Sequence, residues 1–288
     1  MIPSRAPDHD GSQDQASKAK SFRMLHTRPG AFVIANPWDA GTARILTSLG
    51  FEALATTSAG LAFALGRKDG AATRDETLEN ARAIADATSL PVSADLENGF
   101  GHAPEVAAET IRLAAARGLV GASIEDATGD RDHPIYDFAH AVERIAAVAE
   151  AARSQPFPFM LTARAENFLH GRPDLQDTIR RLQAFEKAGA DVLYAPGLPS
   201  IEAIREVCRA VSRPVNALGG ATFSLRELAD AGAKRVSLGS SLSRAALGSF
   251  VRAAREILET GSFDFAREAL PYADANGFMA LTSAKPRT

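Results

Sequence analysis

Short apolar runs alternate with longer, alanine-rich segments along most of the chain. The runs are bounded by polar residues, Gly or Pro and lack clean apolar–polar alternation, which is typical of strands buried on both faces. We expect strands at Phe32–Ala35, Ala53–Thr57, Pro91–Ala94, Val120–Ile124, Phe159–Ala163, Val192–Ala195, Pro214–Ala217 and Arg235–Leu238. The segments between them have helical composition, and several end at a glycine. We expect helices at Glu105–Arg117, Ala139–Arg153, Asp174–Ala188, Ser200–Val211, Ser224–Ala231 and Leu242–Leu258.

The spacing of these runs predicts the topology. Successive strand ends lie about 20 to 40 residues apart, which leaves room for the crossover that parallel strands require. Eight such units predict an α/β fold, a (β/α)8 TIM-type barrel. A doubly wound open sheet is the alternative, but it needs a glycine-rich turn after the first strand. The residues there are Asn36-Pro37-Trp38-Asp39-Ala40, so the barrel is favoured.

The barrel accounts for most of the chain as one catalytic domain, residues 15–260, in which Ser17–His26 forms a short helix across the barrel floor. We expect residues 1–14 to be a disordered tail and residues 261–288 to be a C-terminal helical extension. The pattern leaves open whether that extension packs on its own barrel or on a neighbouring subunit.

Composition excludes several classes of protein. The net charge of the 288-residue chain is -3, which gives no electrostatic reason to expect nucleic acid or an anionic membrane as partner. The single cysteine, Cys208, excludes an intramolecular disulfide and a multi-cysteine metal site. The first residues lack the apolar core of a secretory signal, and no apolar run is long enough to span a membrane. We therefore expect a cytoplasmic protein.

Unusual polar residues follow the predicted strands, where barrels place their chemistry. Asp95 and Glu97 come after the third strand, and Glu125-Asp126 after the fourth. Four converging carboxylates repel one another unless a cation or a proton neutralises them. Oxygen ligands without a histidine cluster favour Mg²⁺. Some of these acids could instead cap helices, but Asp95 directly ends an apolar strand and is the strongest metal candidate.

Two further features could bind an anion. Arg164 ends the fifth strand, where a guanidinium could hold a substrate carboxylate or a developing oxyanion, or form an ion pair with Glu125 or Glu166. The turn Thr57-Ser58-Ala59-Gly60 offers hydroxyl and backbone N–H donors after the second strand.

Taken together, these motifs resemble the isocitrate lyase/phosphoenolpyruvate mutase superfamily from about Phe22 to Phe250. The residues that carry the resemblance are Asn36-Pro37-Trp38-Asp39-Ala40, Thr57-Ser58, Gly66-Arg67-Lys68-Asp69, Asp95-Leu96-Glu97-Asn98-Gly99-Phe100-Gly101, Ile124-Glu125-Asp126, Ala163-Arg164-Ala165-Glu166 and Asn216. The resemblance implies an enzyme that depends on Mg²⁺, or alternatively Mn²⁺, and cleaves 2-oxo acids or their phosphono analogues through a pyruvate enolate. It also implies a homo-oligomer, since the family commonly swaps its eighth helix between subunits.

The resemblance implies a role for each matching residue. Asp95 corresponds to the direct metal ligand, and Glu97, Glu125 and Asp69 correspond to acids that act through metal-bound waters. The turn Thr57, Ser58 and Ala59 matches the stretch that holds the substrate carboxylate, and Arg164 matches the active-site arginine. Glu125 is also a candidate catalytic group. Further candidates for substrate contact are Trp38, Asn216 and Arg244.

The chain departs from the family in the loop after the fourth strand, Ala127–Phe138. The isocitrate and methylisocitrate lyases resemble one another in a Lys-(Lys/Arg)-Cys-Gly-His stretch there, and the mutases and phosphonopyruvate hydrolases place lysine with asparagine or threonine. This loop has no Cys, Lys or Asn, and Pro196 stands where the lyases have glutamate. His133 is the candidate proton donor, or a loop histidine without a role.

Three functions stay open at this point. The first is an oxaloacetate decarboxylase-like C–C lyase or hydrolase, since decarboxylation needs only a stabilised enolate and a late proton donor. The others are P–C bond chemistry on phosphonopyruvate and a non-catalytic barrel that binds a metabolite.

Overall fold

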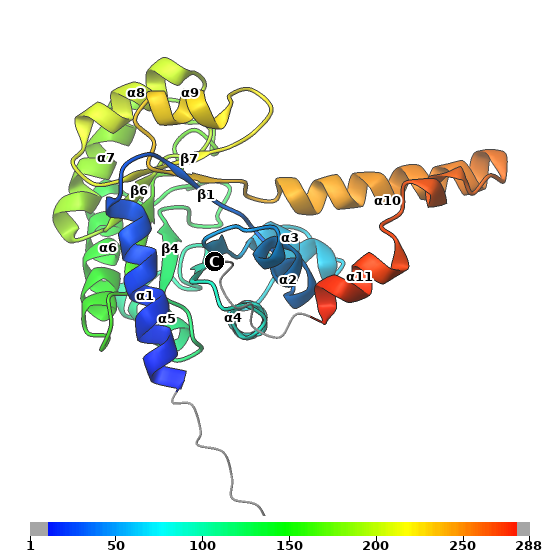
Figure 1. Cartoon of the computed structure of the whole chain (residues 1–288). Coiled ribbons are helices and arrows are strands. Elements are labelled where there is room, and N and C mark those ends of the chain that lie inside the picture. The colour runs from blue at the N-terminus through cyan, green and yellow to red at the C-terminus, as the bar shows by residue number, and fades with distance from the viewer. Residues whose placement is uncertain (1–10, 281–288) are drawn as a thin grey trace, which may run out of the picture.

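Eight parallel strands curl into a nearly closed barrel, which confirms the predicted fold (Figure 1). The computed structural model describes residues 11–280. The strands are β1 (Phe32–Ile34), β2 (Leu54–Ala55), β3 (Val92–Asp95), β4 (Gly121–Glu125), β5 (Met160–Arg164), β6 (Val192–Tyr194), β7 (Val215–Leu218) and β8 (Arg235–Ser237). Each strand from β2 to β8 pairs with the next, and β8 pairs with β1. A single bridge between Ala35 and Leu54 completes the circle.

Helices surround the strands and connect them (Figure 1). They are α1 (Gly11–Thr27), α2 (Ala40–Ser48), α3 (Ser58–Ala64), α4 (Arg74–Asp86), α5 (Pro104–Ala115), α6 (Phe138–Arg153), α7 (Leu175–Ala188), α8 (Ile201–Ala210), α9 (Leu225–Asp230), α10 (Ser241–Thr260), the 3₁₀ helix η1 (Asp264–Arg267) and α11 (Tyr272–Met279). Side chains fix many of their starts, as in the capping boxes of Thr73 with Glu76 and Ser224 with Glu227.

The second strand is shorter than its apolar run. The run Ala53–Thr57 predicted five residues, but β2 ends at Ala55. Thr57 instead takes the N-cap position of α3, where its hydroxyl accepts a hydrogen bond from the Gly60 N–H. The strand therefore ends before the polar residues of the run, and Thr57 serves as the cap of α3 instead.

Helix α1 closes the floor of the barrel. Its Phe22 is fully buried among Phe32, Met160 and Val192. At Gly121 a Cβ would lie 2.8 Å from the Met160 carbonyl oxygen and 3.0 Å from the Phe22 ring, so glycine allows the close packing of β4 between β5 and this helix. The helix begins at Gly11, inside the segment predicted as a disordered tail; residues 1–10 of that segment lie outside the described residues.

The C-terminal helices leave the barrel and return to it. Helix α10 projects away from the strands, and Ser243 is its only buried residue (Figure 1). Helix α11 then packs against α2 of the same chain, where Arg44 Nη1 donates to the Met279 carbonyl at 2.5 Å. The first part of the extension therefore packs on its own barrel, while residues 281–288 lie outside the described part. In residues 11–280, no helix has the length and apolar character to span a lipid bilayer.

Candidate active site

A cavity of about 220 Å³ opens at the carboxyl ends of the strands, where the sequence placed its polar residues. It continues down into the barrel interior. Its lining residues come from all eight strands and the loops after them. Those that carry polar side chains are Asn36, Thr56, Thr57, Ser58, Asp69, Ser93, Asp95, Ser123, Arg164, Tyr194, Asn216, Arg235, Ser237, Ser240, Ser241 and Arg244.

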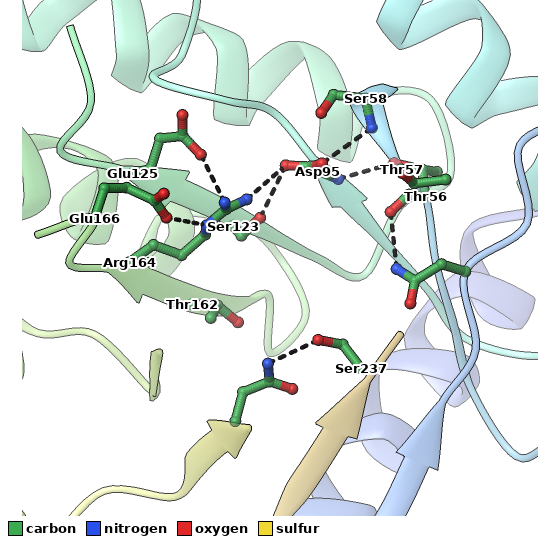
Figure 2. A network of polar contacts seen from close by, with 12 residues as sticks. Thr56, Thr57, Ser58, Asp95, Ser123, Glu125, Thr162, Arg164, Glu166 and Ser237 are labelled. Atoms are coloured by element: carbon green, nitrogen blue, oxygen red, sulfur yellow. Dashed lines mark hydrogen bonds and ion pairs between the residues drawn. The ribbon is translucent and has the colours of Figure 1, made fainter. Parts of the chain in front are cut away.

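Arg164 joins three carboxylates at this cavity (Figure 2). Its Nη1 lies 3.1 Å from Asp95 Oδ1, its Nη2 lies 3.0 Å from Glu125 Oε2, and its Nε lies 2.8 Å from Glu166 Oε1. The Arg164, Asp95 and Glu125 side chains are each only 16% exposed. The ion pairs predicted with Glu125 and Glu166 are both present, and the third pair brings the fifth strand's arginine to the third strand's acid.

The turn after β2 is tied to the same acid. The Ser58 N–H donates to Asp95 Oδ2 at 3.0 Å, and the Asp95 N–H donates to the Thr56 hydroxyl at 2.8 Å (Figure 2). Thr57, Ser58 and Ala59 all line the cavity. The first turn of α3 therefore presents its backbone donors beside Asp95.

The acids around Asp95 disfavour one another's charged forms. Burial, together with the negative charges of Asp95 and Asp69, raises the pKa of Glu97 to about 7. Burial also raises the pKa of Glu125 well above its usual range, although the Arg164 cation opposes this effect. The pKa of Asp69 is raised by burial and by Asp95. Three acids with raised pKa values mark a place where a cation would be stabilised.

Glu97 has a second unusual property. Its φ is +50°, in the left-handed region that residues with side chains rarely adopt, and its Oε1 is buried without a hydrogen-bond partner. A buried carboxylate oxygen without a donor is costly, and a cation or a cation-bound water would satisfy it. The donor set is all oxygen, which fits a hard ion such as Mg²⁺.

The geometry limits how many side chains could touch such an ion. Among residues 11–280, no three His, Cys, Asp or Glu side chains converge closely enough to ligate one ion directly. A hard cation here would therefore take few protein ligands and complete its coordination with water, which is ordinary for Mg²⁺. Asp95 is the acid at the centre of the contacts.

The remaining candidates are distributed differently. Asn216 is buried in the cavity wall, where its Nδ2 donates to the Ser237 hydroxyl at 2.9 Å. Arg244 lies on α10 and lines the mouth of the cavity. Trp38 is half-buried and is not part of the lining. His133 is exposed in the loop after β4. In the described part of the chain, none of its hydrogen bonds reaches Arg164 or the three carboxylates that Arg164 contacts.

That loop is anchored at its base. The Tyr136 N–H donates to the Asp126 carbonyl at 2.8 Å, and the Tyr136 hydroxyl lies 2.8 Å from His102 Nδ1. The Arg144 guanidinium stacks on the Tyr136 ring, with 4.4 Å from Cζ to the ring centroid. Cys208 lies on α8 and packs against Gly232, and burial raises the pKa of its thiol to about 11. It has the character of a packing residue.

Sequence reasoning missed the polar interior of the barrel. Ser93, Ser123, Thr162, Tyr194, Ser237 and Arg235 face the interior below Arg164, inside runs that were treated only as apolar strands. The available signal was a serine two positions before the charged residue that ends the strand, Ser93 before Asp95 and Ser123 before Glu125.

Comparison with known proteins identifies the family. The phosphoenolpyruvate phosphomutase family model matches residues 22–258. A solved structure described as a lyase/mutase from Burkholderia cenocepacia J2315 is 58% identical to this chain, with a TM-score of 0.92. The match covers 94% of this chain and 98% of that one.

Two curated relatives have named activities. The oxaloacetate decarboxylase of Bradyrhizobium diazoefficiens is 31% identical over 217 residues, which are 73% of each chain. The 2-methylisocitrate lyase of Escherichia coli K12 is 29% identical over 207 residues, which are 69% of each chain. The resemblance drawn from the motifs is thus confirmed: this chain belongs to the phosphoenolpyruvate phosphomutase family, within the isocitrate lyase/phosphoenolpyruvate mutase superfamily of enzymes.

Proposed function

We propose that this protein is a Mg²⁺-dependent lyase that cleaves a C–C bond of a small 2-oxo dicarboxylic acid, with oxaloacetate decarboxylation as the simplest reaction. The observation that carries the proposal is the contact of Arg164 with Asp95 and Glu125 beside the cavity, next to acids whose pKa values are raised: Asp69, Glu97 and Glu125 itself. The similarity to an oxaloacetate decarboxylase supports the choice of substrate.

Asp95 would hold the Mg²⁺ ion directly, and Glu97, Glu125 and Asp69 would hold its waters. When bound, the ion would supply a Lewis acid that polarises the substrate carbonyl. Mn²⁺, which accepts the same oxygen ligands, would substitute for it.

The protein's own groups bind and orient the substrate. The turn at Thr57, Ser58 and Ala59 takes the carboxylate next to the carbonyl through donors other than the Ser58 N–H, which binds Asp95, and Asn216 and Arg244 also line the cavity. Arg164 uses only three of its five N–H donors on carboxylates, so two can face the oxygen on which negative charge develops.

In decarboxylation the bond between the terminal carboxylate and its neighbouring carbon breaks, CO₂ leaves, and the electron pair forms an enolate. That carbon then takes up a proton to give pyruvate. His133 is our candidate donor, brought to the mouth by closure of the loop after β4. Replacing His133 by Asn should lower the turnover number about 10²-fold, while the same change at exposed His170 should have no effect.

A coupled assay for pyruvate tests the proposal, after subtraction of the decarboxylation that Mg²⁺ causes without protein. We expect turnover of oxaloacetate that chelation abolishes. Asp95→Asn and Arg164→Lys should each lower it about 10²- to 10³-fold, whereas Glu79→Gln, which changes an exposed acid on α4, should not. Full activity of Asp95→Asn would overturn the role of this cluster.

Parallel reactions with methylisocitrate and phosphonopyruvate separate the alternatives. Pyruvate release from phosphonopyruvate alone would assign P–C chemistry instead. No turnover of any of the three above the metal background would favour a metabolite-binding barrel.

A further inference from the structure

The floor of the cavity is polar and open below Arg164. Barrel interiors are usually filled by Val, Ile and Leu. Here Ser93, Ser123 and Ser237 line the cavity, and Thr162 lies beside it as the neighbour of Arg235. These small side chains leave space where branched aliphatic residues would fill it, so the lining of the cavity includes Ser93 and Arg235 as well as Asp95 and Arg164.

Arg235, the first residue of β8, reaches into this floor. Its side chain lines the cavity, and the residue is only 5% exposed. Its Nε donates to Asn216 Oδ1 at 2.8 Å and its Nη2 donates to the Thr162 hydroxyl at 3.0 Å. Its Nη1 is buried and has no hydrogen-bond partner.

No negative charge compensates this guanidinium in the described part of the chain. Both hydrogen-bond partners are neutral. The titratable groups that face Arg235 are neutral too. Burial raises the pKa of Tyr194 to about 12. Burial and the Arg235 cation together lower the pKa of His26 on α1 to about 3. The acids above it, Asp95, Glu125 and Glu166, all pair with Arg164. Burial lowers the pKa of Arg235 to about 10, so it stays charged at neutral pH.

An uncompensated buried cation destabilises the fold, and such a cost is commonly found where function requires the group. The position fits a ligand that spans the cavity. Arg235 contacts Thr162, which precedes Arg164 by two residues on β5, so the backbones of these two β5 residues lie about 7 Å apart along the strand.

We propose that Arg235 is a specificity-determining residue that binds one carboxylate of the substrate at the cavity floor, so that the enzyme selects acids with two carboxylates over acids with one. The inference rests on the proposed function, because it assigns the second acid group of the same substrate. It places that group at Arg235, inside the barrel, and not at Arg244 on the exposed helix α10.

Titration calorimetry with succinate and butyrate tests this without any turnover, because the two acids share a four-carbon chain and differ by one carboxylate. Wild-type protein should bind succinate at least 10-fold more tightly than butyrate. Arg235→Met should abolish that preference while its urea midpoint is no lower than that of wild type, since the variant removes an uncompensated charge. Arg226→Met, which removes an exposed arginine on α9, should keep the preference.

Equal affinity of wild-type protein for the two acids would overturn the inference, even if Arg235→Met did not fold. So would loss of the preference in Arg244→Met but not in Arg235→Met. In the pyruvate assay, Arg235→Met should raise the KM for oxaloacetate at least 10-fold with little change in kcat. Succinate preference without turnover of any 2-oxo acid would refute the proposed function alone, and turnover without that preference would refute this inference alone.

Discussion

Two arginines inside one barrel have opposite surroundings. Arg164 meets three carboxylates from three strands, whereas Arg235 meets only an amide and a hydroxyl. The sequence predicted Arg164 because it ends an apolar run, where barrels place their chemistry. It did not predict Arg235, because a charged residue that begins such a run usually lies at the solvated rim. Only the three-dimensional path of its long side chain brings the guanidinium into the cavity.

For the acids too, the sequence predicted their positions but not their surroundings. Asp95, Glu97 and Glu125 were predicted as a cluster from their positions after neighbouring strands. Their unequal surroundings were not predictable, because the left-handed backbone at Glu97 and the unpartnered Oε1 depend on how the loop after β3 folds.

The buried His26 leads us to predict how the stability of the protein depends on pH. Its imidazole is buried between Phe22 and Phe32, and its pKa of about 3 lies below the value of about 6.5 expected in the unfolded chain. Below about pH 6.5 the unfolded state therefore binds a proton that the folded state does not, so stability falls as the pH falls toward 3. We expect this group to lower the free energy of unfolding by about 2 kcal/mol at about pH 5.

Urea denaturation at pH 7 and pH 5 measures this effect. His26→Gln should remove about that much of the pH dependence, and His170→Gln, at an exposed position, should keep all of it. Identical pH dependence in the two variants would contradict the assignment.

At the scale of elements, the strands were the most predictable part of the structure. Each of the eight apolar runs overlaps an observed strand, because a parallel sheet covered on both faces leaves little choice of residue type. Helices α3 and α4, between β2 and β3, were not predicted individually. The short α3 owes its start to the Thr57 cap, and such local hydrogen bonding does not show in apolar periodicity.

Helix α1 closes the barrel floor, so its buried face should contribute strongly to stability. Phe22 is fully buried and Met24, two residues along, is 61% exposed. We expect Phe22→Ala to lower the free energy of unfolding by about 3 to 5 kcal/mol, through lost burial and the cavity it leaves. Met24→Ala should change it by less than about 0.5 kcal/mol. A cost for Phe22→Ala as small as that of Met24→Ala would show that α1 does not seal the floor.

At the scale of the whole molecule, packing on its own barrel does not account for helix α10. It carries exposed apolar side chains, among them Phe250 at 72% and Leu258 at 86%. An amphipathic pattern is the same whether a helix packs on its own chain or on another. The sequence therefore predicted the helix but not that it projects away from its own barrel. The large apolar surface agrees with the oligomer that the family resemblance implies.

Sedimentation velocity tests that expectation. We expect the wild-type protein to sediment as a multiple of the 30.4 kDa chain. Phe250→Asp combined with Leu258→Asp should shift it toward the monomer, because the change would bury charges in the contact. Met24→Asp places the same charge on exposed apolar surface of α1 and should leave the mass unchanged. A monomeric wild-type protein would contradict the prediction.

The proposed function depends on a divalent cation beside Asp95 that stabilises an enolate together with the Arg164 guanidinium. Oxalate is a planar dianion shaped like the pyruvate enolate, so its affinity reports on that stabilisation whatever the physiological substrate. The most direct measurement is its dissociation constant by titration calorimetry, with Mg²⁺ and with chelator. We predict that oxalate binds at least about 100-fold more tightly with Mg²⁺, a difference of about 2.7 kcal/mol, and that Asp95→Asn removes the difference. Equal affinity of oxalate with and without Mg²⁺ would contradict the proposed role of the cation.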